Sequence, residues 1–210
     1  MLGERLTSRI EQIARYLAKK EIALHVTRRA PLCMSVIEDA ETAIRRALPR
    51  DLVELYSSFS NGFDLFWRCD PYFARLSLPT LSQFVKNYCE FQAGVCEMLC
   101  SPAEYFDESR ISDGRAALKR MLNRAVLWHT GGDGNSVCID LETQEVLFHD
   151  REWPFYESFE CDFRVSDCLS EMLLDWGRIC FLQFPGCPGT DPTPGQSNVP
   201  DYSGCPFIID

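Results

Sequence analysis

The stretch VLWHTGGDGNSVCIDLETQEVLFHD, residues 126–150, decides the fold, because it reads as three short strands joined by two tight turns. Residues 126–129, 136–141 and 145–149 are rich in apolar and β-branched side chains, which favours strands. Residues 131–134 and 142–144 supply polar and glycine-rich turns between them. Strands with such short connections pair antiparallel, so the stretch predicts an antiparallel meander.

The glycine-rich turn does not match a known ligand-binding loop. A phosphate-binding loop needs Gly-Lys-Ser/Thr followed by a helix, and a dinucleotide fingerprint needs spaced glycines between a strand and a helix. An EF-hand needs acidic ligands at alternate positions and a closing Glu. Glycine tolerates positive φ, and Asp and Asn bond readily to the nearby backbone. We therefore interpret Gly132, Asp133, Gly134 and Asn135 as a structural turn.

Helical periodicity predicts helices on both sides of the meander, at residues 2–20, 35–48, 50–60, 81–99, 115–124 and 166–182. Ser35 and Glu38 match a capping box, and Ser166 is placed to cap the last helix. Asn61 and Gly62 form a structural turn that ends the third helix. Short strands are predicted at residues 63–67 and 74–78.

The formal net charge is −10 and is unevenly distributed along the chain. Residues 1–50 hold ten Lys and Arg against six Asp and Glu, whereas the remainder holds eleven against twenty-five. An acidic body repels nucleic acid, whose binding depends on Lys and Arg, so we expect no nucleic-acid partner. It attracts basic partners instead. Solubility alone is the alternative explanation.

Eleven cysteines occur without a C-x-x-C pair. The N-terminus has no apolar segment typical of a secretory signal, and no apolar run is long enough to span a membrane. We therefore expect a cytoplasmic protein whose cysteines are reduced and mostly pack in the core. Cys89, Cys96 and Cys100 share one helical face, for which core packing is favoured over a thiolate metal site.

Known catalytic motifs do not occur in the sequence, and we expect no catalytic residues, cofactor or metal. There is no G-x-S-x-G elbow and no H-x-E with P-C-x-x-C. His129 and His149 stand near strand ends, where surface or hydrogen-bonded roles are favoured over catalysis. A Cys/His nucleophile pair stays open as an alternative, because nothing selects one cysteine.

The last 26 residues, 185–210, form a Pro/Gly-rich tail after a single domain of residues 1–184. The tail has too few apolar residues for its own core, so we expect it to be extended or mobile. Its apolar end, PFIID, docks either on the domain or on a partner. The N-terminal helix, residues 1–20, is either part of the domain or an extension of it.

Two segments together resemble the SUKH superfamily of immunity and regulatory proteins. ALPRDLVELYSSFSNGFDLFW, residues 47–67, is similar to its first signature, in which a helix with L-P-x-D-L ends in N-G before an aromatic strand. GDGNSVCIDLETQEVLFHDRE, residues 132–152, is similar to the second signature, and SDCLSEMLLDW looks like the closing helix. The resemblance implies an α+β domain, with helices packed on one curved antiparallel sheet, and a binding role rather than catalysis.

The resemblance and the charge together predict a non-enzymatic protein-binding domain, most simply an immunity protein that binds and occludes a basic, nuclease-type toxin. Steric occlusion aided by electrostatic attraction is the expected mechanism. The alternative is an intracellular regulatory scaffold of the same superfamily, whose tail is a ligand for another module. The expected contact surface lies near the strand ends and consists of Asp64, Trp67, Asp133, Asp150, Glu152 and Glu157.

Overall fold

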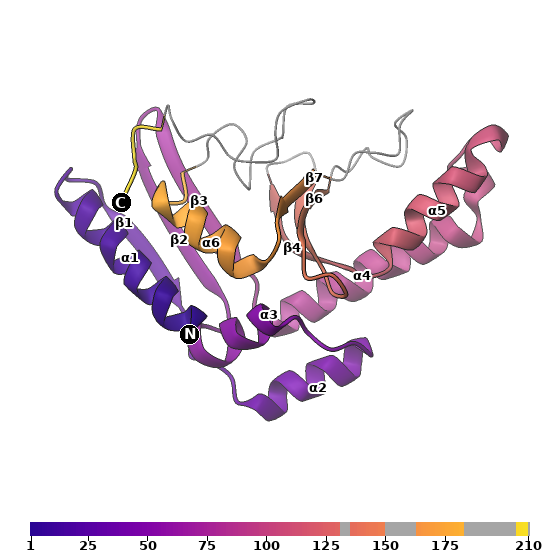
Figure 1. The fold of residues 1–210 in the computed structure, drawn as a ribbon, viewed down its shortest axis with the longest axis horizontal. Coiled ribbons are helices and arrows are strands. Elements are labelled where there is room, and N and C mark those ends of the chain that lie inside the picture. Colours follow the sequence, from indigo (N-terminus) through magenta and orange to yellow (C-terminus); the bar gives the residue numbers. More distant parts are fainter. Residues whose placement is uncertain (131–134, 150–162, 183–204, 210) are drawn as a thin grey trace.

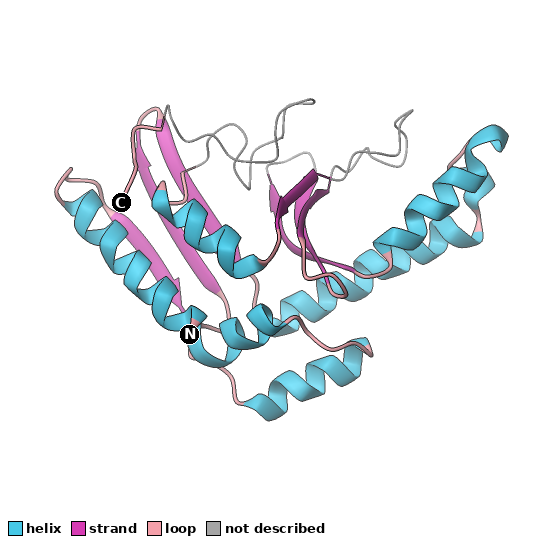
Figure 2. Cartoon of the chain, in the orientation of Figure 1, coloured by secondary structure: helices cyan, strands magenta, loops and turns pink. Residues whose placement is uncertain are grey.

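Two antiparallel sheets form the centre of the fold, and helices pack on them (Figures 1 and 2). The structure, a computed structural model, describes residues 1–130, 135–149, 163–182 and 205–209. Helices packed on antiparallel strands confirm the α+β class. The strands are divided between a three-stranded and a four-stranded sheet rather than forming one sheet, although the two sheets contact each other.

The first sheet contains β1 (Leu24–Arg28), β2 (Phe63–Cys69) and β3 (Tyr72–Leu78), in that order. The predicted strands are confirmed as β2 and β3, whereas β1 was not predicted. Side chains along β2 alternate: Phe63, Leu65 and Trp67 are buried, and the residues between them are exposed. Since successive strand residues point to opposite faces, one face of this sheet is core and the other faces outward.

The second sheet contains β4 (Arg124–Thr130), β5 (Asn135–Asp140), β6 (Val146–His149) and β7 (Phe163–Ser166). Antiparallel pairing of β4 with β5 and of β5 with β6 confirms the predicted meander. Asp140 holds the β5–β6 turn, because its Oδ1 accepts hydrogen bonds from the backbone N–H groups of Glu142 and Thr143 at 2.8 and 2.9 Å. β7 was not predicted.

The helix α1 (Leu2–Ala18) lies beside α6 (Leu169–Arg178), and both line the main core (Figure 1). Leu2, Leu6, Ile13 and Leu17 of α1 are buried, so the N-terminal helix contributes directly to that core. The cap predicted for α6 is wrong, since Ser166 is the last residue of β7 and the helix begins three residues later.

Helix α2 (Met34–Ile44) packs at the periphery, against α4 (Leu81–Cys100) and η1 (Leu55–Phe59). It begins at Met34 after Cys33, which makes no side-chain capping bond, so the capping box predicted from Ser35 and Glu38 is wrong. α3 (Arg50–Glu54) continues directly into the π-helix η1 (Leu55–Phe59). The predicted third helix is therefore present, with its second half wound more widely than an α-helix.

Helix α4 (Leu81–Cys100) is capped by Thr80, whose Oγ1 accepts a hydrogen bond from the backbone N–H of Gln83 at 3.2 Å. Its second half and α5 (Ile111–Met121) form a hairpin that projects from the sheets (Figure 2). Two short turns, η2 (Pro102–Glu104) and η3 (Glu108–Arg110), connect them. The hairpin has a small separate core, made of Val95, Phe106, Ala117, Leu118 and Met121.

The described end of the tail, residues 205–209, packs on the domain. Phe207 is buried, with its ring centroid 4.7 Å from that of Trp67 and 5.5 Å from that of Tyr72. The backbone N–H of Ile209 donates to the carbonyl of Arg178 at 2.7 Å. The apolar end therefore docks on the domain, which is one of the two predicted alternatives. The expectation of an extended or mobile tail otherwise falls on residues outside the described ranges.

Candidate functional site

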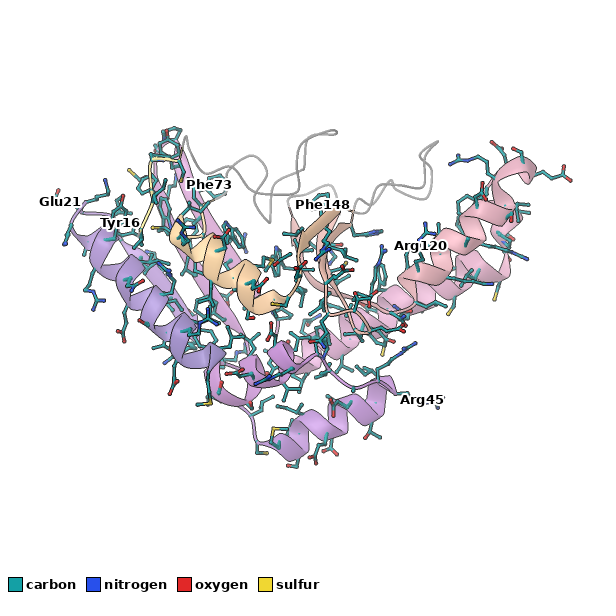
Figure 3. All side chains as sticks on the ribbon, viewed as in Figure 1. Tyr16, Glu21, Arg45, Phe73, Arg120 and Phe148 are labelled. Carbon is teal, nitrogen blue, oxygen red and sulfur yellow. The ribbon has the colours of Figure 1, made fainter. Side chains whose placement is uncertain are left out.

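One face of the β1-β2-β3 sheet carries aromatic and arginine side chains that no described element covers. We call it the outer face, and it consists of His25, Thr27, Asp64, Phe66, Arg68, Phe73, Arg75 and Ser77. Phe66 is 41% exposed and Phe73 is 44% exposed. Figure 3 places Phe73 near the tip of the β2–β3 hairpin.

The centre of the outer face is Phe66, which is paired with His25 of β1 on one side and with Arg75 of β3 on the other. The ring centroids of His25 and Phe66 are 6.3 Å apart. Phe73 is opposite Arg68, one step diagonally from Phe66, and long side chains reach such diagonal neighbours. Two phenylalanines and two arginines thus alternate across adjacent strands.

Two charged residues of the outer face already have partners. Arg68 Nε lies 2.6 Å from Asp70 Oδ1, and Ser77 Oγ donates to Asp64 Oδ1 at 2.5 Å. Arg75 forms no ion pair with any described residue, and its guanidinium is therefore available to a partner. Asp64, an expected contact residue, is exposed here but already accepts one hydrogen bond.

Trp67 does not belong to the contact surface, which corrects the sequence-based expectation. It is fully buried, its Nε1–H donates to the backbone carbonyl of Cys180 at 2.7 Å, and its ring packs on Phe207. The alternation along β2 already contained this information. Trp67 has the same parity as Phe63 and Leu65, whereas Phe66 has the parity of Asp64 and Arg68, so the sequence could have placed Phe66 outside and Trp67 inside.

The remaining expected contact residues, Asp133, Asp150, Glu152 and Glu157, lie outside the described residues. The same holds for Gly132 and Gly134 of the expected turn, while Asn135 is the first residue of β5, opposite Thr130. The structure therefore gives no geometry for the acidic part of the expected surface.

The turn at Asn61 and Gly62 joins η1 to β2 and also contacts the first residue of α4. Gly62 has φ of +99°, a backbone conformation that favours glycine. A Cβ at this position would also lie 2.9 Å from Cγ2 of Thr80, so both the backbone conformation and the lack of space exclude a side chain. Asn61 Oδ1 accepts a hydrogen bond from the backbone N–H of Leu81 at 2.9 Å. This turn positions the outer face by fixing where β2 begins.

The three histidines lie on strands. His25 is on the outer face, and His129 and His149 flank Ser136 in a row across β4, β5 and β6. His129 is exposed, whereas His149 is buried, with its ring edge-on to Phe91 at 5.5 Å between centroids. No group of three or more His, Cys, Asp or Glu among residues with a described placement is arranged to hold a metal ion.

The cysteines divide between core and surface. Cys180 is buried, and burial raises the pKa of its thiol to about 12, against the opposing positive charges of Arg9 and Lys20. Cys89, Cys96 and Cys100 share one face of α4, but that face is exposed, so the expectation that they pack in the core is wrong. The charged neighbours Lys86, Glu90 and Glu97 on the same side of the helix were the signal for exposure.

A scan of the chain against known protein families finds no match, and a search of curated proteins finds no significant relative. Among the described residues, no helix has both the length and the apolar character that a membrane crossing requires. The outer face is therefore identified as the candidate site from its geometry alone.

Proposed function

We propose that this chain is a non-enzymatic protein-binding domain that uses the outer face as its main contact surface. The observation that carries the proposal is the composition of that face: two exposed phenylalanines beside two arginines, with no lysine or glutamate among its eight residues. The cores of protein interfaces are enriched in aromatic residues and Arg and depleted in Lys and Glu. Hot-spot residues are enriched in Trp, Tyr and Arg, and of these types the outer face supplies Arg68 and Arg75.

The rigid backbone beneath the outer face suits such a role. Every outer-face residue is on a strand, and the opposite face of those strands is anchored by the buried side chains of Leu65, Trp67 and Leu76. A backbone held in a packed sheet needs little ordering when a partner binds, which favours affinity.

The partner that we favour is a basic toxin domain, most simply a nuclease, which the protein neutralises by covering its active site. Three features support this: the net charge of −10, the resemblance of two segments to the SUKH superfamily, and the absence of recognisable catalytic motifs in the sequence. The negative charge comes from residues outside the outer face, whose own charged residues are Asp64, Arg68 and Arg75. It accelerates the encounter with a basic protein but does not form the contact itself. A cytoplasmic location fits this role and the free thiols of the described residues.

A regulatory scaffold is the alternative. Its tail-as-ligand form is disfavoured for residues 205–209, because Phe207 is buried against Trp67 and Tyr72. Deleting residues 185–203 separates the two functions without removing Phe207. If the protein is of immunity type, the deletion variant still neutralises the toxin. If the protein neutralises no toxin and the deletion variant loses a binding partner, the scaffold is supported.

Sequencing the reading frames beside its gene and co-expressing this protein with any toxin domain found there tests the proposal. The wild-type protein is expected to restore growth, and the purified pair is expected to form a complex whose association slows as salt increases. If growth is not restored and no complex forms with that domain, the immunity proposal fails. A restored culture without a complex would point to an indirect effect and also contradict it.

A further inference from the structure

A small cavity between α1 and α6 is lined by polar groups that the proposed function does not use. Its volume is about 260 Å³, and its lining consists of Arg5, Ser8, Arg9, Gln12 and Leu174. The four polar residues come from consecutive turns of α1, and their spacing of three or four places them on one side of the helix. Leu174 of α6 forms the apolar wall.

Arg9 is held in place by α6. A Cβ added to Gly177 would lie 2.8 Å from Cγ of Arg9, so the aliphatic part of this side chain lies directly on the α6 backbone. The contact depends on the absence of a side chain at position 177. The guanidinium is thereby fixed at the helix–helix boundary rather than extended into solvent.

Two polar atoms of this lining are buried without a hydrogen-bond partner among the described residues: Nη1 of Arg9 and Oε1 of Gln12. Buried polar groups are nearly always hydrogen-bonded, and an unsatisfied group next to a charge is costly. Neither Arg5 nor Arg9 forms an ion pair with a described carboxylate. One atom is a donor and the other an acceptor, so a single ligand that both accepts and donates can satisfy them.

The carboxylates near the cavity are directed elsewhere. Glu4 and Glu11 line a separate cavity of about 320 Å³ on the other side of Ser8, and Glu4 lies 3.4 Å from the N-terminal amine. Asp175, next to Leu174, lies 3.5 Å from Nη1 of Arg178. The α1–α6 cavity therefore has two guanidinium groups and no lining carboxylate.

We propose that the α1–α6 cavity binds a small oxyanion, of which hydrogen phosphate is the simplest. Its charged oxygens accept from Arg5, Ser8 and Arg9, and its P–OH donates to Oε1 of Gln12. Guanidinium groups recognise phosphate with strong, charge-assisted hydrogen bonds. The site is independent of the outer face, and either can fail without the other.

Calorimetric titration of the full chain with inorganic phosphate, at constant ionic strength, tests the site. Saturable one-to-one binding is expected for phosphate. Sulfate, which matches phosphate in shape but has no proton at neutral pH, is expected to bind as well, because the Gln12 amide can rotate to donate from Nε2. The absence of saturable phosphate binding overturns the proposal.

Matched variants locate the site. Arg9→Gln is expected to weaken phosphate binding at least about tenfold, while Arg15→Gln, the same change on an exposed turn of α1, leaves it within about twofold. Arg5→Gln, at an exposed position, provides a second variant that keeps the fold, with a loss of several-fold expected. Equal weakening by the changes at Arg5 and Arg15 would indicate only a general charge effect and would overturn the assignment.

Discussion

Asp51 of α3 caps α6 across 119 positions of the chain: its Oδ2 accepts a hydrogen bond from the backbone N–H of Ser170 at 2.7 Å. Ser170 is the second residue of α6, where backbone donors have no partner within the helix. A carboxylate there is also favoured by the helix dipole. Asp51 is the acidic residue of the LPRDL segment, so this bond gives that position a structural role.

Replacement of Asp51 by Ala is expected to lower the free energy of unfolding by about 1 to 2 kcal/mol, because it removes the cap of α6. Asp39→Ala, at an exposed position of α2, is the matched control and is expected to change it by less than about 0.5 kcal/mol. Urea unfolding followed by circular dichroism measures both. Equal stability of the two variants would contradict the capping role.

Phe207→Ala is expected to destabilise the protein by about 3 kcal/mol, because the ring is buried against Trp67 and Tyr72. Ile208→Ala removes the adjacent side chain, which is 39% exposed, and a much smaller loss is expected. Tryptophan fluorescence should shift to longer wavelength in the first variant only. If truncating either residue has the same small effect, the end of the tail does not pack on Trp67.

Two glycines in the α4–α5 hairpin are expected to respond in opposite directions to alanine. A Cβ at Gly94 meets no atom within 4 Å, so Gly94→Ala should stabilise α4 by about 0.5 to 1 kcal/mol. A Cβ at Gly114 would lie 2.8 Å from the Phe106 ring, so Gly114→Ala should disturb the small hairpin core. Thermal unfolding of the two variants distinguishes them, and stabilisation by both would refute the packing of Phe106 on α5.

Alkylation of the native protein at pH 8 is expected to modify exposed cysteines first. The thiolate is the nucleophile, and a pKa of about 12 keeps the buried Cys180 thiol protonated at this pH. Cys33 is exposed, and a hydrogen bond from Ser35 is the main cause that lowers its pKa, so it should react quickly. Cys96 and Cys100 are exposed as well. Mass spectrometry that finds Cys180 modified as fast as Cys96 would contradict its burial.

Local patterns explain most of what the sequence predicted. The apolar stripes of α1, α4 and α6 and the short turns of the β4–β5–β6 meander are visible within single segments. β1 and β7 were missed because each has only a few residues and depends on a neighbouring strand, β2 or β6, for its pairing. The cap of α6 was assigned to Ser166 because the true acceptor, Asp51, is remote in sequence.

The candidate site was only half visible for a related reason. Charge and resemblance drew attention to acidic strand ends, and Trp67 was the one aromatic residue among the expected contacts. Alternation along β2 places Trp67 in the core and Phe66 on the exposed face. Arg75 joins Phe66 only through the β2–β3 register, which the sequence does not specify.

The affinity of a Phe66→Ser/Phe73→Ser variant for the proposed toxin partner tests the role of the outer face most directly. The control is Met34→Ser/Val36→Ser on α2, whose side chains are 49% and 42% exposed and thus matched in exposure. Titration calorimetry is expected to give a loss of at least about 2 kcal/mol, roughly 30-fold in Kd, for the outer-face variant and little change for the control. Unchanged affinity of the outer-face variant, or an equal loss in the control, would show that the partner binds elsewhere.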